Sequence, residues 1–269
     1  MRTRNLEARS NGGKAAPYRD NWWWLVIAII GIVVLLAVLT PDPYWRIIKF
    51  VSDGILVSIG VTAVAFVLTL VLGLLTALGR LSKIGIINWV TTIYVEIARG
   101  VPLLVQLLFW YFAFPSLIQS FGKLIHFEPF ERYLANPYFM AILGLTFCYA
   151  AYMSEIYRAG IQSISKGQNE AARSLGMTHG QAMRYIILPQ AIKVILPPVG
   201  NEFISLLKDS SLVSVVSVAD MTRRGREFMA ANFLPVETWL MVALLYLIMT
   251  LISARLVACI ERKTKTEER

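Results

Sequence analysis

A run without a single charged residue covers positions 22–40, and it limits the folds open to this chain more than any other feature. At about 1.5 Å per residue, a helix of this length crosses the roughly 30 Å hydrocarbon core of a bilayer. Pro41 and Pro43 follow without a small-residue cleavage site, which favours a retained membrane helix over a cleaved signal peptide. The string Trp22-Trp23-Trp24 is typical of an anchor at the membrane interface.

Five further apolar segments predict an all-α polytopic membrane protein with about six transmembrane helices. The segments are 54–79, 88–115, 138–161, 190–218 and 238–260. We expect the span 190–218 to break near Pro197 and Pro198, and residues 116–137 to be a polar connection. Hydrophobic residues make up 57% of the chain, charged residues 16%, and the mean hydropathy is +0.60, values that exclude an ordinary soluble domain.

The basic residues are unequally distributed between the two sides of these spans. With both termini on one side, 15 Lys and Arg flank the spans there and 7 flank them on the other. The positive-inside rule therefore predicts cytoplasmic termini, with tails at 1–21 and 261–269. The cluster Arg223, Arg224 and Arg226 runs against the rule and suggests a surface helix that faces a partner outside. This topology explains the net charge of +9, because no nucleic-acid-binding motif accompanies it.

Residues 167–189 interrupt the apolar pattern with small and charged side chains, so they predict two short helices that stand out of the membrane. Gly176 can end the first helix in the left-handed conformation. Thr178 and Gln181 have the spacing of a capping box at the start of the second. Pro189 marks the kinked beginning of the next helix.

This stretch resembles the signature loop of bacterial ABC-importer permeases, whose pattern is E-A-A, three residues, Gly, nine residues and I-x-L-P. Here the pattern is Glu170-Ala171-Ala172, then Gly176, then Ile186-x-Leu188-Pro189. Other strings are similar to the polar amino-acid branch of these permeases. They are Glu96-x-x-Arg99-Gly100-x-Pro102, Glu155-x-x-Arg158 and Lys208-Asp209-Ser210-Ser211-Leu212. The resemblance predicts a permease core at 52–260 with a coupling loop at 162–189, and an additional first helix at 22–40.

The resemblance implies a type I ABC-importer core in a bacterial inner membrane. Its partners would be a dimer of cytoplasmic ATPase subunits, a second permease, identical or related, an extracytoplasmic solute-binding protein and an amino-acid substrate. ATP and Mg would be used by the ATPase, because this chain has no G-x-x-x-x-G-K-[ST] loop and no cofactor of its own is expected. The residues expected to couple ATPase motion to the membrane helices are Glu170, Ala171, Ala172, Arg173 and Gly176.

Two Glu/Arg pairs lie within the predicted spans, where an ionisable residue costs roughly 2.5 to 3.5 kcal/mol on insertion scales. Glu96 and Arg99 are three residues apart, as are Glu155 and Arg158, so each Glu can pair with its own Arg. One interpretation makes them structural ion pairs on the cytoplasmic side. The alternative is that Glu96 and Glu155 contact the substrate.

The span 190–218 carries a second group of polar residues. They are Asn201, Glu202, Ser205, Lys208 and Asp209, and they follow the expected Pro-Pro break, where freed carbonyls can line a water-filled cavity. A zwitterionic substrate needs an acceptor for its ammonium and a donor for its carboxylate, and this group contains both. The alternative is that Lys208 and Asp209 merely end the apolar stretch near the outer surface.

Other classes of protein have less support. Neither a Ser, His and Asp arrangement nor an H-E-x-x-H motif indicates an enzyme, and Cys148 and Cys259 lie too far apart in sequence to indicate a metal site. A secondary, ion-coupled transporter would show an inverted repeat, whereas only one signature loop is present. A membrane scaffold would not need charged residues in its spans. The identity of the amino acid and of the second permease stays open.

Overall fold

The computed structural model describes residues 22–265, and within this range the chain is helical without strands. Four helical segments are long and apolar enough to cross a membrane, namely Pro41–Arg80, Leu103–Ile125, Pro137–Gln162 and Pro235–Arg262. The helix α1, Trp22–Leu39, is apolar and shorter. The predicted all-α polytopic fold is confirmed. The predicted tail 1–21 lies outside the described residues, as do residues 266–269.

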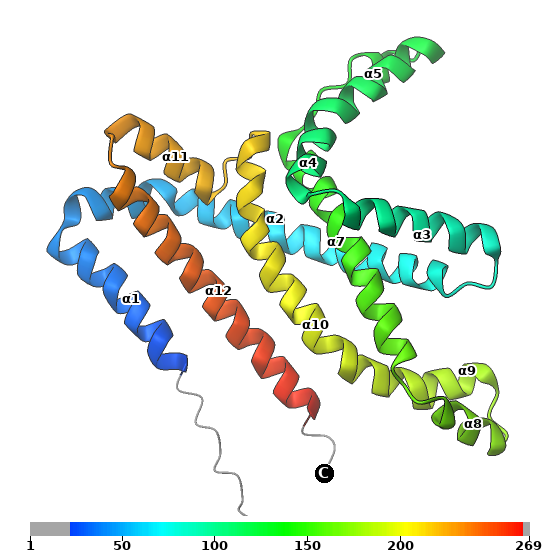
Figure 1. Ribbon diagram of the computed structural model, residues 1–269. Helices are drawn as coiled ribbons and strands as arrows, with labels where there is room; N and C mark the ends of the chain where they lie inside the picture. Colours follow the sequence, from blue (N-terminus) through cyan, green and yellow to red (C-terminus); the bar gives the residue numbers. More distant parts are fainter. Residues whose placement is uncertain (1–21, 266–269) are drawn as a thin grey trace, which may run out of the picture.

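Helix α7, Pro137–Gln162, is the centre of the molecule. It packs along α2, Pro41–Arg80, on one side and against α10, Leu188–Asp209, on another (Figure 1). In its most apolar window 61% of the residues are buried, against 17 to 28% for the other three candidate spans. Helix α12, Pro235–Lys265, covers α10, and α1 lies outermost against α12 and α2. Contacts on several sides therefore fix α7, and it is suited to carry a site.

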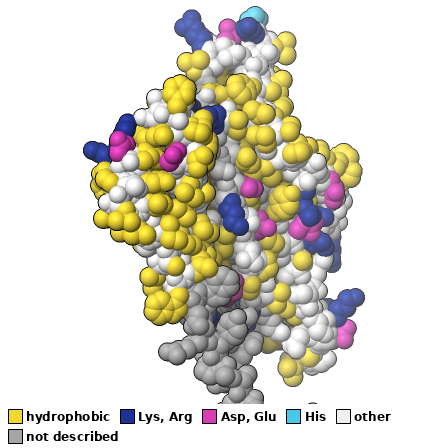
Figure 2. All heavy atoms as spheres, turned by 60° about the vertical axis from the view of Figure 1, so that its left-hand side comes forward, with side chains coloured by type: hydrophobic (Ala, Val, Ile, Leu, Met, Phe, Trp, Pro, Cys, Tyr) yellow, Lys and Arg dark blue, Asp and Glu magenta, His cyan; other side chains and the backbone are white. Residues whose placement is uncertain are grey.

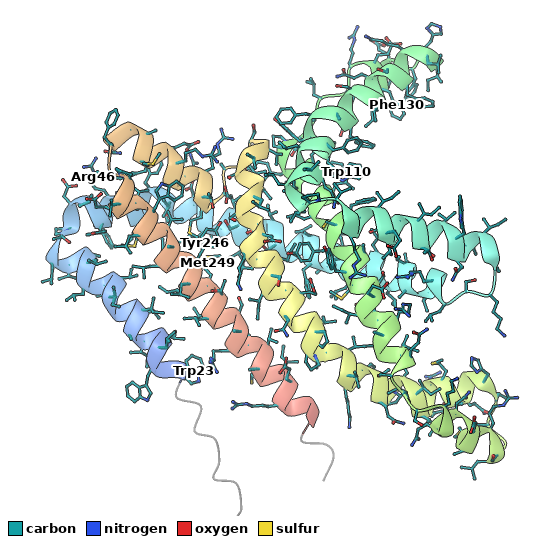
Figure 3. The ribbon with its side chains drawn as sticks, viewed as in Figure 1. Trp23, Arg46, Trp110, Phe130, Tyr246 and Met249 are labelled. Atoms are coloured by element: carbon teal, nitrogen blue, oxygen red, sulfur yellow. The ribbon has the colours of Figure 1, made fainter. Side chains whose placement is uncertain are left out.

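The distribution of apolar residues between the surface and the interior of the bundle is the reverse of that in a water-soluble protein. Hydrophobic side chains cover most of the face shown in Figure 2, and Trp23 projects outward from the beginning of α1 in Figure 3. The buried side of α2 instead carries small and hydroxyl-bearing residues, including Ser58, Ala65, Thr69 and Gly73. Small residues let membrane helices approach closely, while lipid accepts the apolar outer face. The helices are thus arranged for a bilayer.

The predicted span 88–115 is wrong, because the chain breaks in its middle. Helix α3, Gly85–Gly100, ends before an extended Val101 with φ −102° and ψ 132°. Pro102 follows, and a proline disfavours the helical conformation of the residue before it. The next helical segment runs without interruption through α4, Leu103–Leu108, the π-helical turn Phe109–Ala113 and α5, Phe114–Ile125.

The predicted polar connection 116–137 is therefore helical at its beginning and continues into the short α6, Glu128–Glu131.

The predicted break near Pro197 and Pro198 is also wrong, because α10 is helical through both prolines. Close neighbours hold the helix in place on two sides. A Cβ added to Gly160 of α7 would lie 2.2 Å from Ile195, and one added to Gly200 would lie 2.2 Å from Val257 of α12. Packing of this kind allows a membrane helix to keep its path at prolines.

After α10 the chain forms a 3₁₀ helix, Ser210–Val216, then α11, Met221–Asn232, and α12. Helix α12 continues to Lys265, so residues 261–265 are helical rather than part of a tail.

Candidate functional site

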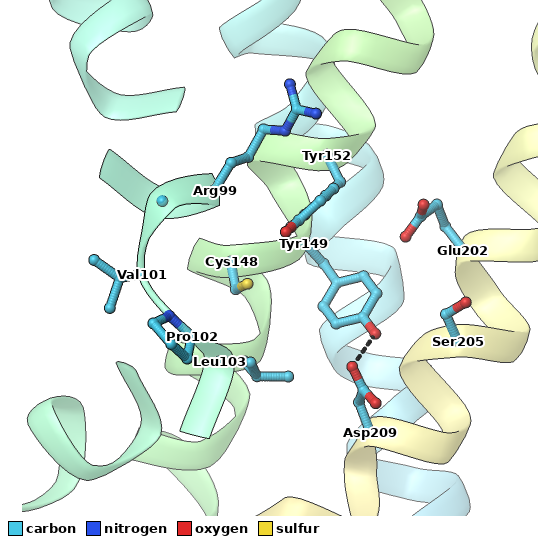
Figure 4. Close-up of a pocket in the computed structure, with 11 residues that line it drawn as sticks. Arg99, Val101, Pro102, Leu103, Cys148, Tyr149, Tyr152, Glu202, Ser205 and Asp209 are labelled. Carbon is cyan, nitrogen blue, oxygen red and sulfur yellow. Dashed lines mark hydrogen bonds between the residues drawn. The ribbon is translucent and has the colours of Figure 1, made fainter. Parts of the chain in front are cut away.

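A cavity of about 430 Å³ opens beside the break between α3 and α4. Three parts of the chain meet there: the α3–α4 junction, the middle of α7 and the C-terminal half of α10 (Figure 4). The lining residues are Arg99, Gly100, Val101, Pro102, Leu103, Cys148, Tyr149, Tyr152, Glu202, Ser205 and Asp209. Charged side chains thus border a hollow between helices of a membrane protein. A charge there is energetically unfavourable unless an oppositely charged partner, water or a ligand stabilises it.

The backbone break is stabilised by one side chain. The amide nitrogen of Gln106, a buried residue of α4, donates to the carbonyl oxygens of Ala98 at 2.7 Å and Val101 at 2.8 Å. Carbonyls at a helix end have no partner within their helix, so Gln106 satisfies two of them. Gln106 therefore ties the last turn of α3 to α4, with Arg99 at the edge of the cavity.

Helix periodicity decides which polar residues of α10 reach the cavity. Glu202, Ser205 and Asp209 are three and four residues apart, so they share one face, and all three line the cavity (Figure 4). Asn201 and Lys208 are exposed on another face and do not line it. Asp209 therefore does more than end an apolar stretch.

The aromatic residues of α7 lie between the two charged sides. The Tyr149 hydroxyl donates to Oδ2 of Asp209 at 2.7 Å. The Arg99 guanidinium lies over the Tyr152 ring, 5.3 Å from its centroid. The cavity is thus polarised, with a cation on the α3 side and two carboxylates on the α10 side.

Next to the cavity, one carboxylate on α7 binds three guanidinium groups. Arg158 lies 2.7 Å from Oε2 of Glu155, which confirms the predicted pairing of these two residues. Arg80, from the end of α2, binds Oε1 of the same Glu155, and Arg99 lies 3.7 Å from that atom. Glu155 therefore joins the ends of α2 and α3 to α7.

The predicted pairing of Glu96 with Arg99 is wrong. Glu96 is exposed and forms no ion pair with any residue in the described range. Helical spacing permits this pair, but the tertiary structure offers Arg99 a less exposed carboxylate on α7. Of the residues proposed for the substrate path, the cavity therefore brings together Glu202, Ser205 and Asp209. Glu155 lies beside it, and Glu96, Asn201 and Lys208 lie away from it.

This arrangement has a direct chemical consequence. A guanidinium binds a carboxylate through paired charge-assisted hydrogen bonds, and carboxylates bind ammonium groups. A small zwitterion would therefore find complementary groups on opposite sides of the cavity. Tyr149, Tyr152 and the backbone at Val101 were not predicted as part of this site, although Pro102 was a signal for the break.

After the C-terminal end of α7, residues 166–182 form the predicted pair of short helices. They are α8, Lys166–Ser174, and α9, His179–Ala182. Gly176 has φ +80° between them, and Thr178 and Gln181 form the complete capping box. A π-helical turn, Met183–Ile187, then precedes α10, so the irregular turn ends two residues before Pro189.

The α8–α9 pair exposes large apolar side chains on part of its surface. Leu175 is 82% exposed and Tyr185 is 61% exposed, and both border a hollow of about 270 Å³ together with Gly176, Met177 and Gln181. Of the predicted coupling residues, Ala172 is buried, whereas Glu170, Ala171, Arg173 and Gly176 are exposed. Large apolar side chains around a hollow with a polar margin are typical of a protein interface.

The cluster of Arg223, Arg224 and Arg226 lies on α11, and Arg224 joins that helix to α2. Arg224 reaches Oδ2 of Asp53 at 2.5 Å and Oε2 of Glu227 at 3.0 Å. Arg223 binds the other oxygen of Glu227 at 3.0 Å, and hydrogen bonds from Arg223 and Arg224 hold the pKa of Glu227 below its usual range. The predicted surface helix is present, and its outward partner stays a prediction.

The fold and the site together define a membrane permease: a helical bundle with a polarised cavity between its spans and a helical loop with exposed apolar side chains. The chain belongs to the family described as binding-protein-dependent transport system inner membrane component, whose model matches residues 69–266.

Curated relatives cover most of the chain. The glutamine transport system permease protein GlnP of Escherichia coli (strain K12) is 35% identical over 82% of this chain and 95% of its own length. The arginine transport system permease protein ArtQ of Bacillus subtilis (strain 168) is 33% identical over the same shares. The L-cystine transport system permease protein TcyB of the same organism is 39% identical over 72% of this chain and 76% of its own.

Solved structures agree with this assignment. One titled as an amino acid ABC transporter with histidines is 40% identical, with a TM-score of 0.71, over 80% of this chain and 94% of that chain. Inward-facing MetNI methionine ABC transporter structures share the fold at 19% identity, with a TM-score of 0.57 for one crystal form.

Membership in this family makes the chain a multi-pass inner-membrane subunit of a transporter and not an enzyme. It implies an ATPase partner and a binding protein, and it disfavours the alternative of an ion-coupled transporter.

Proposed function

We propose that this chain forms the path by which an ATP-driven importer moves a polar or charged amino acid across the membrane. The observation that carries the proposal is the polarised cavity. Arg99 faces it from α3, and Glu202 and Asp209 face it from α10. An amino acid presents a carboxylate and an ammonium group, and the cavity presents one side to each. The glutamine, arginine and L-cystine systems named among the relatives support the same substrate class.

The assembly that we propose has four kinds of subunit. A second permease, identical or related, stands beside this chain, and an extracytoplasmic binding protein delivers the amino acid. Two ATPase subunits bind the α8–α9 loop from the cytoplasm and use ATP and Mg. The exposed Leu175 and Tyr185 support this last contact, because a water-exposed loop gains from covering them. Both termini face the cytoplasm in this arrangement.

Replacing Arg99 by Gln tests the substrate path. The variant keeps a polar side chain but removes the charge that would bind the carboxylate common to all amino acids. Glu155 retains Arg80 and Arg158, so the permease should still assemble with its ATPase. Uptake into proteoliposomes that contain the whole transporter should fall about tenfold for every transported amino acid, the effect of losing one charge-assisted interaction. Arg132→Gln, in an exposed pair with Glu128, is the control. Unchanged uptake by Arg99→Gln would exclude this cavity from the path.

The coupling loop has its own test. Gly176→Leu places a side chain at a φ of +80°, which costs about 1–2 kcal/mol locally and alters the surface between α8 and α9. Glu170→Lys reverses an exposed charge on α8. Both variants should insert normally but lose co-purification with the ATPase and ATP-driven uptake. Gly31→Leu on α1, where a Cβ meets nothing within 4 Å, should retain both properties. Normal uptake in the loop variants would show that another surface couples the subunits.

A further inference from the structure

Two guanidinium groups lie close to the same oxygen atom of Glu155. The other oxygen, Oε2, is bound by Arg158, whose Nη2 and Nε lie at 2.7 Å and 3.0 Å. Arg80 binds Oε1, and Arg99 lies 3.7 Å from this same atom, beyond the length of a hydrogen bond. Arg80 therefore occupies Oε1 in this structure, and Arg99 is available to the cavity that it lines.

The two guanidiniums near Oε1 differ in their surroundings. The side chain of Arg80 is 13% exposed, whereas that of Arg99 is 44% exposed and lies over the Tyr152 ring. A buried guanidinium depends on its carboxylate more than a solvated one does, because water no longer stabilises its charge. Arg80 is thus the stronger competitor while the end of α2 stays against α7. If Arg80 moves away, Arg99 can replace it after a shift of about 1 Å, to ion-pair distance.

Glu155 is connected to the α8–α9 loop through a continuous helix. It lies seven residues before the end of α7, and only residues 163–165 separate α7 from α8. The backbone nitrogen of Ser163 still donates to the carbonyl oxygen of Ala159 at 2.9 Å, as in a helix. A movement of α8 is therefore transmitted to the C-terminal end of α7, and Glu155 moves with it.

Arg80 belongs to a second unit, the hairpin of α2 and α3. The Asn88 side chain in the first turn of α3 donates to the carbonyl oxygen of Arg80 at 2.5 Å. A Cβ on Gly79 would lie 2.5 Å from Cγ2 of Thr91, so α2 and α3 are in close contact at this end. Arg99 lies in the last turn of α3, about 16 Å along the helix from Asn88 at 1.5 Å per residue. The two guanidiniums thus approach Oε1 from opposite ends of α3.

We propose that Arg80 is a positioning residue for transport, which determines whether Arg99 is available to the amino acid. The inference rests on the proposed function, in which Arg99 binds the α-carboxylate. While Arg80 holds Oε1, Arg99 binds the amino acid. When the ATPase shifts α8 and α7 along α3, Oε1 passes from Arg80 to Arg99, and the amino acid loses its cationic partner. The exchange is a two-state element that the ATPase and the amino acid bias in opposite directions.

The test measures amino-acid binding to the complete permease–ATPase complex in detergent, without the binding protein. A ligand that binds only the folded state raises the Tm according to its affinity. The probes are L-glutamine, L-arginine and L-cystine, the amino acids for which the systems of the relatives are named. Arg80→Gln leaves Oε1 to Arg99, so it should weaken binding about tenfold, the value of one charge-assisted interaction, although Arg80 does not line the cavity. Arg158→Gln is the matched control, because it removes a cation from Oε2 instead and should leave the affinity unchanged.

The double variant Arg80→Gln/Glu155→Gln separates the exchange from a structural role. Without the carboxylate, nothing on α7 competes for Arg99, so binding should return to about the affinity of the parent. Two purely structural losses would add instead. A double variant that binds as weakly as Arg80→Gln overturns the inference, and so does unchanged affinity in Arg80→Gln. Where Arg80→Gln does not assemble, Glu155→Gln alone should bind at least as tightly as the parent, and weaker binding overturns the inference.

The link to the ATPase has its own measurement. A non-hydrolysable ATP analogue with Mg should weaken amino-acid binding by the parent complex. It should have little further effect on Arg80→Gln, in which Oε1 already belongs to Arg99, and equal weakening of both complexes would contradict the exchange.

Arg99→Gln distinguishes a failure of the inference from a failure of the proposed function. If Arg99→Gln loses amino-acid binding while Arg80→Gln keeps it, the inference fails and the proposed function stands. If Arg99→Gln binds amino acids as the parent does, both fail.

Discussion

At the scale of single residues, Glu155 is a carboxylate that brings cations from several helices together. Its single carboxylate lies within ion-pair distance of three guanidiniums from three helices, and its side chain is 20% exposed. A half-buried carboxylate with this many cationic partners holds them together, because each of them would otherwise repel the others at short range in a poorly screening environment. The cluster thus positions Arg99 for the cavity and joins the end of α2 to α7.

Glu155→Gln should lower the free energy of unfolding by about 2 kcal/mol, the typical cost of leaving buried charged groups without their partner. The Tm of the purified permease in detergent measures this loss. The double variant Glu155→Gln/Arg158→Gln should regain part of it, since one unpaired cation is then removed. Glu128→Gln breaks an exposed pair with Arg132 and should change stability by less than about 0.5 kcal/mol. Equal Tm values for Glu155→Gln and the parent would show that the cluster contributes nothing to stability.

At the scale of helices, close approach of α2 and α11 depends on one glycine. A Cβ on Gly54 would lie 2.7 Å from the Cα and 2.8 Å from the backbone nitrogen of Met221, at the beginning of α11. Backbone atoms cannot turn away as a flexible side chain can. The cap of α11 would shift as well, since Asp220 accepts hydrogen bonds from the backbone of Thr222 and Arg223.

Gly54→Ala should therefore destabilise the protein by about 1–3 kcal/mol, the usual cost of inserting an extra group into a packed region. Gly60 is the matched control, because it lies on the same helix and a Cβ there meets nothing within 4 Å. Gly60→Ala should stabilise by up to about 1 kcal/mol, the difference in helix propensity. The Tm of each variant measures these changes in stability. Equal Tm values for Gly54→Ala and Gly60→Ala would contradict close packing of α2 against α11.

Local rules explain which elements could be predicted from the sequence. The α8–α9 pair depends on short-range signals, the capping box at Thr178 and the left-handed Gly176, so it was predicted correctly. The break at Val101 was missed because the apolar character of 88–115 outweighed Pro102. The partner of Arg99 could not be predicted at all, since the meeting of α3 with Glu155 of α7 is a tertiary contact.

At the scale of the whole molecule, the two ends of the bundle differ in what they carry. Figure 1 places α8 and α9 at one end, together with the end of α12, and places α5 and α11 at the other. Between α6, which follows α5, and α8 the chain passes once through α7, a helix with the length and hydropathy of a membrane span. The surplus of basic residues predicts that the α8–α9 end faces the cytoplasm.

Single cysteines at positions 179 and 128 test this sidedness, in a background where Ser replaces Cys148 and the exposed Cys259. His179 lies in α9 and Glu128 in α6, and both are exposed. A membrane-impermeant maleimide should label His179→Cys only in inside-out vesicles and Glu128→Cys only in right-side-out vesicles, because α7 alone separates the two positions by one crossing. Labelling of both from one side would mean that α7 does not cross the membrane. Exchange of the two patterns would keep the fold but invert it, placing the apolar surface around Leu175 out of reach of a cytoplasmic ATPase.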